Sequence, residues 1–91
     1  MQATATLMQE VSIDEPLGRV FVLFEKGRIQ PLELEWKNRR WKVRRVNSNW
    51  VDRSLRPHRH GFSLTMESGE IFQVCYEESN PVWKLEYILT D

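Results

Sequence analysis

The amino-acid sequence predicts an all-β fold, namely a small curled antiparallel sheet or an open barrel of about six strands in three hairpins. From Gly18 onward, β-branched and aromatic residues alternate with polar ones, as they do in half-buried strands. Turn-forming residues separate these stretches at short intervals. The chain has 91 residues, 11% of them aromatic and four of them Trp, so one domain can build its core from a few large side chains.

The overall composition is that of a globular protein, with 41% hydrophobic and 29% charged residues. A single Cys excludes an intrachain disulfide and a four-Cys zinc site. No apolar run approaches the roughly 20 residues that span a bilayer. The N-terminus has neither the basic segment nor the apolar segment of a secretory signal. We therefore expect a soluble cytoplasmic protein.

Residues 1–16 are polar and weakly patterned, and they end at Asp14-Glu15-Pro16. Proline restricts the residue before it and interrupts regular structure. We expect an N-terminal tail over residues 1–16, disordered or at most a short helix. Residues 17–91 are expected to form a single small β domain.

The first two predicted strands cover residues 19–25 and 28–36, and Lys26-Gly27 forms the turn between them because glycine adopts a positive φ. A second two-residue turn at Asn38-Arg39 leads into a third strand over residues 40–47. This turn places Trp36 opposite Trp41 and Glu35 opposite Lys42, whereas a one-residue slip would put Trp beside Lys.

Val46 breaks the alternation set by Trp41 and Val43, which predicts a β-bulge at Arg44-Arg45. Residues 47–60 are expected to be an irregular basic loop. A loop this long in a small domain is usually functional or disordered.

The last three predicted strands cover residues 60–66, 70–76 and 83–89. Glu67-Ser68-Gly69 fits a three-residue hairpin turn. The expected cross-strand pairs form one apolar face: Leu64 with Phe72, Phe62 with Val74, Val74 with Leu85, Phe72 with Tyr87, and Tyr76 with Trp83.

The thirteen basic and thirteen acidic residues cancel overall but not locally. Between residues 37 and 60 there are nine Lys or Arg and one acid, Asp52, so this window has a charge of +8 and the remainder has −8. Such a segment attracts polyanions at short range. The alternative is that the acidic segments fold against it and neutralise it.

This basic window makes nucleic-acid binding the leading hypothesis, with single-stranded or duplex nucleic acid as partner. Small antiparallel barrels bind single strands by combining a basic groove with aromatic side chains on which bases stack. Trp50 is the stacking candidate, although burial as an anchor of its loop is the favoured interpretation of this residue. The predicted binding residues are Arg39, Arg40, Arg45, Trp50, Arg53, Arg56 and Arg59.

The competing hypothesis is a protein-interaction or assembly module, such as a homodimer. Surfaces of opposite charge on one protomer would neutralise each other on association. The exposed edge strands of an open sheet offer a second route to a partner.

No catalytic or metal centre is expected. The candidate ligands His58, His60, Cys75 and Asp52 do not form a four-ligand zinc site, and two solvent-exposed histidines are the simpler interpretation. Cys75 lacks a third group to orient a neighbouring His, and no Ser lies in a nucleophile elbow. We therefore predict a protein that is not an enzyme and that uses no cofactor.

Residues 36–91 resemble a family of short, uncharacterised bacterial all-β proteins. The shared pattern consists of Trp36, the Arg39-Arg40 turn, Trp41-Lys42-Val43, Trp50, Phe62-Ser63-Leu64, Gly69, Phe72 and Trp83-Lys84-Leu85. The resemblance implies a small β fold and no activity. The chain differs from the family in its basic loop, where Arg53, Arg56 and Arg59 stand in place of acids.

Overall fold

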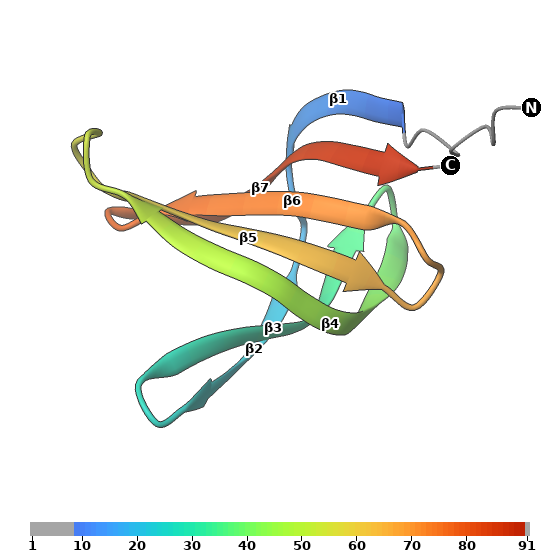
Figure 1. The fold of residues 1–91 in the computed structure, drawn as a ribbon, viewed down its shortest axis with the longest axis horizontal. Coiled ribbons are helices and arrows are strands. Elements are labelled where there is room, and N and C mark those ends of the chain that lie inside the picture. Colours follow the sequence, from blue (N-terminus) through green and yellow to red (C-terminus); the bar gives the residue numbers. More distant parts are fainter. Residues whose placement is uncertain (1–8, 91) are drawn as a thin grey trace, which may run out of the picture.

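The computed structural model describes residues 9–90, which form one open antiparallel sheet of seven strands (Figure 1). The all-β prediction is confirmed. The strands are β1 (Gln9–Pro16), β2 (Val20–Glu25), β3 (Arg28–Trp36), β4 (Arg39–Asp52), β5 (Arg59–Met66), β6 (Ile71–Glu77) and β7 (Asn80–Thr90). Their order across the sheet is β1-β7-β6-β5-β4-β3-β2. Residues 9–90 include no helix long and apolar enough to cross a membrane.

The extra strand is β1, so the prediction of a tail is wrong for residues 9–16; residues 1–8 lie outside the described part of the chain. Strand β1 pairs with β7 from Gln9↔Thr90 to Pro16↔Lys84. Its own sequence lacks apolar alternation because the strand is mostly exposed. The partner strand therefore determines its structure, and no local pattern indicates it.

The sheet curls until its two edges approach each other at residues 17–19, which connect β1 to β2 (Figure 1). The Leu17 amide donates to the Trp83 carbonyl of β7 over 2.8 Å, and the Gly18 amide donates to the Glu35 carbonyl of β3 over 2.9 Å. The curled face encloses the core, which consists of Leu17, Leu34, Phe62, Leu64, Met66, Phe72, Val74 and Leu85.

The β2–β3 hairpin turns at Lys26-Gly27 as predicted, with both residues at positive φ. The β3–β4 turn lies at Lys37-Asn38 instead of Asn38-Arg39. Lys37 and Asn38 have φ of 52° and 58°, the left-handed pair that a two-residue hairpin turn requires. The register consequently pairs Leu34 with Trp41 instead of Trp36 with Trp41.

The β3–β4 prediction failed by two residues, and a two-residue shift keeps every side chain on the same face of the sheet. Leu34 still meets an apolar residue, Trp41, and Glu33 and Glu35 still meet bases, Lys42 and Arg40, whereas Trp36 meets Arg39. The matching of opposite charges thus could not distinguish the two registers.

Strand β4 is 14 residues long and continues to Asp52. The prediction of an irregular segment over residues 47–60 is therefore wrong except for the loop between Asp52 and Arg59. The predicted bulge at Arg44-Arg45 is confirmed by the register shift between Val43 and Arg45, and a second shift follows between Val46 and Ser48. These irregularities let β4 pair with β3 through its first part and with β5 through the rest.

The predicted β5–β6 register is confirmed, with Leu64 opposite Phe72 and Phe62 opposite Val74. In the β6–β7 pair, Val74 lies opposite Leu85 as predicted. Phe72, however, lies opposite Ile88 and not Tyr87, because the register shifts between Gln73 and Val74. Tyr87 pairs with Gln73 instead, and its hydroxyl donates to the Gln73 side-chain oxygen.

Candidate nucleic-acid interface

Strand β4 separates the predicted binding residues into two groups. A strand rises about 3.3 Å per residue, so the ends of a 14-residue strand are about 40 Å apart along its length. Arg39 and Arg40 lie at the end next to the β3–β4 turn, and Arg45 lies on the bulged middle part. Arg53 and Arg56 lie in the loop after the other end, and Arg59 begins β5. The predicted binding residues are therefore spread along β4 and the loop that follows it, and they do not form a single patch.

The first group is engaged by neighbouring side chains of the same chain. The Arg39 guanidinium carbon lies 4.1 Å from the Trp41 ring centroid, and Arg40 Nε lies 3.8 Å from a Glu33 carboxylate oxygen. Arg45 Nε donates to Asn47 Oδ1 over 3.0 Å. These contacts are exposed and therefore weak, but they hold the three guanidinium groups close to the surface of the sheet.

The second group surrounds the β4–β5 loop. Arg59 is paired with Glu77 at 3.7 Å across the β5–β6 ladder. Arg53 and Arg56 lie in the loop between Asp52 and Arg59, where both are exposed. Asp52 accepts hydrogen bonds from the backbone amide and the hydroxyl of Ser54, which lower the pKa of its carboxyl group. This turn fixes the start of the basic loop.

Trp50 lies on the outer face of the sheet, opposite Gly61 of β5. Its indole covers the glycine, and a Cβ on Gly61 would lie 2.6 Å from the indole nitrogen. The missing side chain thus provides the space in which the ring packs. Trp50 is 39% exposed, so it is not a buried anchor and its outer side remains accessible for stacking.

On the inner face of the same end, a groove of about 470 Å³ lies between the β2–β3 turn and the strands β4, β5 and β6. Sequence reasoning missed it because its residues come from four separate strands. The groove is lined by Gly27, Arg28, Ile29, Asn49, His60, Phe62 and Tyr76. The register aligns Asn49 with Phe62 and His60 with Tyr76, and the curl of the sheet brings residues 27–29 next to them.

An aromatic stack forms one wall of the groove. The His60 and Tyr76 rings are 4.8 Å apart and nearly parallel, with an interplanar angle of 5°. Tyr76 in turn lies 4.7 Å from Trp83, and Phe62 lies 5.3 Å from Trp83. Burial raises the pKa of the Tyr76 hydroxyl, and the charge of Glu78 contributes to the shift. The Tyr76 ring therefore stays uncharged at neutral pH, and it lines the groove together with His60 and Phe62.

Glu78 holds His60 in place in this stack. His60 Nε2 donates to Glu78 Oε1 over 2.9 Å, and His58 Nδ1 lies 3.6 Å from the same oxygen. The hydrogen bond from His60 is the main reason that the pKa of Glu78 is lowered. His58 and His60 thus share a carboxylate and are not the independent exposed residues that the sequence predicted.

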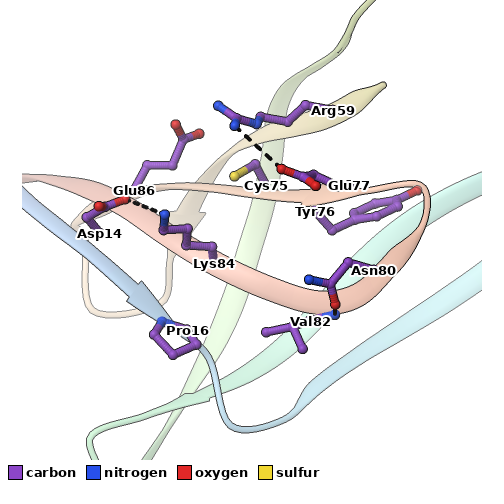
Figure 2. Close-up of a pocket in the computed structure, with 10 residues that line it drawn as sticks. All are labelled: Asp14, Pro16, Arg59, Cys75, Tyr76, Glu77, Asn80, Val82, Lys84 and Glu86. Carbon is purple, nitrogen blue, oxygen red and sulfur yellow. Dashed lines mark hydrogen bonds and ion pairs between the residues drawn. The ribbon is translucent and has the colours of Figure 1, made fainter. Parts of the chain in front are cut away.

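A second, smaller hollow of about 220 Å³ lies around Cys75 on the opposite face of β6 and β7 (Figure 2). Four of its five charged residues form ion pairs, Lys84 with Asp14 at 2.7 Å and Arg59 with Glu77. Burial and the charge of Glu86 raise the pKa of the Cys75 thiol to about 11. The thiol is consequently protonated at neutral pH and is a poor nucleophile and metal ligand there.

Within residues 9–90, no group of three or more His, Cys, Asp or Glu side chains could hold a metal ion. The chain matches no protein-family model, no curated protein and no solved structure.

Proposed function

We propose that this protein is a non-enzymatic module that binds single-stranded nucleic acid at the end of the sheet that contains the β4–β5 loop. The observation that supports it most is the aromatic stack of His60, Tyr76 and Trp83, in which the His60 and Tyr76 rings line the groove. Proteins that hold single strands combine aromatic rings for the bases with cations along the backbone. Both are present at this end of the sheet.

Besides aromatic rings, the groove has enough volume for a base and polar groups that can bind it. A volume of about 470 Å³ falls within the range of small-molecule sites, about 300–1,000 Å³. The Asn49 side-chain amide has donors and an acceptor, which is what a base edge requires. Arg28, on the other wall, supplies a planar guanidinium that can bind a phosphate through two hydrogen bonds or stack on a base.

Arg53 and Arg56 extend the positive charge beyond the groove. Both arginines lie in the β4–β5 loop, shortly before His58 and His60 in the sequence. A nucleic-acid strand that leaves the groove at this end therefore passes close to them. We assign phosphate contacts to this pair and to Arg28. Trp50, on the other face of the same end, is the second stacking residue for a longer oligonucleotide. Arg39 and Arg40, at the far end of β4, lie outside this interface.

A salt titration tests the proposal. Fluorescence anisotropy of a labelled thymidine oligomer is expected to show binding at low salt, and a duplex of equal length is expected to bind more weakly because its bases are not available for stacking. For single strands, log Kobs falls with log salt by about 0.7 per neutralised phosphate. The double variant R53A/R56A is therefore expected to reduce the slope by about 1.4.

The matched control is R39A/R40A, which removes the same charge from the other end of β4. It is expected to leave the slope unchanged. Equal slopes for both double variants would show that the attraction is a general effect of charge, and absence of binding at micromolar protein would refute the proposal.

A further inference from the structure

The two edges of the sheet are protected to very different degrees. Natural edge strands avoid association through charges, proline and bulges. Strand β1 has all three: the acids Glu10, Asp14 and Glu15, the terminal Pro16, and an irregular register between Ser12 and Glu15. Strand β2, at the opposite edge, is apolar without interruption from Val20 to Phe24.

Strand β2 also exposes large apolar side chains. Phe24 is 73% exposed, Phe21 45% and Leu23 40%. Leu32, which lies at the register shift on the neighbouring strand β3, is exposed as well. Apolar side chains concentrated along one edge strand mark a surface for association.

The backbone N–H and C=O groups at alternate residues of β2 point away from β3, as pairing with an added strand requires. Glu25 and Arg28 flank the two-residue turn, so they form a hydrogen-bonded pair, and bonded and non-bonded pairs alternate from there. Phe24 and Val22 are thus in non-bonded pairs and direct their N–H and C=O groups away from β3. The position of Pro31 opposite Val22 agrees with this, because proline has no N–H to donate.

We propose that the β2 edge binds the β2 edge of a second copy of this chain, in an antiparallel pair centred on Val22. A two-fold axis through Val22 joins the two sheets into one continuous sheet. The outward backbone groups of Val22 bond to those of its symmetry mate. The remaining pairs across the interface are Phe21 with Leu23, Val20 with Phe24, and Arg19 with Glu25, each occurring twice.

The pairing of Arg19 with Glu25 argues for a second copy over another partner. The two residues that end the apolar stretch have opposite charges, and the symmetry brings each next to its complement. A pair centred on Leu23 would place Phe21 opposite Glu25 and Arg19 opposite Gly27, so it would lose the match of opposite charges.

A charge-reversal experiment tests both the interface and its register. Sedimentation equilibrium is expected to give a dimer whose dissociation constant is micromolar, as for a small interface. R19E or E25R alone makes two symmetric pairs repulsive and is expected to raise that constant about tenfold. The double variant R19E/E25R restores the attraction and the wild-type constant. Both side chains are exposed, so the fold tolerates these changes.

The control is V11K, which places a lysine on the exposed face of the other edge strand and is expected to leave the dimer unchanged. A monomer at millimolar protein overturns the proposal, even if β2 then binds an extended peptide from another protein. A dimer in which the double variant is no better than the single ones overturns the register, and a dimer weakened by V11K places the interface at β1.

Discussion

The Cys75 side chain lies close to charged groups, but its thiol is protonated and unreactive at neutral pH. Its thiol lies on the outer face of β6, near Glu86, Arg59 and Lys84 (Figure 2). Burial has a larger effect than these charges and raises the pKa of the thiol to about 11. At pH 7 only about one thiol in ten thousand is ionised. The sequence-based interpretation of Cys75 as a small strand residue fits this environment.

The raised pKa predicts a loss of stability at alkaline pH. The thiol of the unfolded chain ionises near pH 9, whereas the folded protein keeps its proton up to about pH 11. The stabilisation is fully present below the unfolded pKa and is lost as the pH rises through the folded one, because the unfolded state then binds fewer protons. Cys75→Ala removes this dependence.

Urea unfolding of the wild type and of Cys75→Ala measures the effect. The free-energy advantage of the wild type is expected to shrink by about 1–2 kcal/mol between pH 7.5 and pH 10.5. Tyr76 and Tyr87, whose pKa values are also raised by burial, are present in both proteins and cancel in the difference. A difference that is constant with pH would contradict the assignment.

At the scale of the element, the β3–β4 hairpin depends on two residues held at positive φ. Lys37 and Asn38 form the turn, and Arg39 is a strand residue opposite Trp36. The turn that the sequence predicted would instead put Lys37 in the strand and Arg39 in the turn. The two arrangements therefore make opposite demands on residues 37 and 39.

Glycine substitution distinguishes the two registers. Lys37→Gly relieves a left-handed backbone and is expected to change the free energy of unfolding by less than about 0.5 kcal/mol. Arg39→Gly places a glycine in a strand and removes the contact with Trp41, so it is expected to destabilise the protein by about 1 kcal/mol. Thermal or urea unfolding of the two variants measures both values. A larger destabilisation by Lys37→Gly than by Arg39→Gly would support the turn that the sequence predicted.

How well each element could be predicted depended on how local its determinants were. The β5–β6 hairpin was predicted in register because Gly69, with φ of 102°, fixes the turn and the apolar residues on both sides have one consistent match. The β3–β4 turn offered two registers that match the acids with bases equally well. Strand β1 offered no pattern, because its order comes from pairing with β7.

At the scale of the whole molecule, the basic window from 37 to 60 is spread over the length of β4 and into β5. Residues close in the sequence become distant in an extended strand, so a count of charges overstated how far they converge. The groove shows the opposite relation between sequence and space. Arg28, Asn49 and Tyr76 are far apart in the sequence, and only the curl of the sheet brings them around one space. The sequence could therefore predict the kinds of residue but not the site.

The most direct test of single-strand binding in this groove is an NMR titration of the labelled protein with a thymidine octamer. The backbone amide signals of Arg28, Asn49 and His60 are expected to shift together and to saturate, while those of Arg39 and Arg40 stay in place. Shifts centred on Arg39 and Arg40, or no shifts at millimolar protein, would contradict the account.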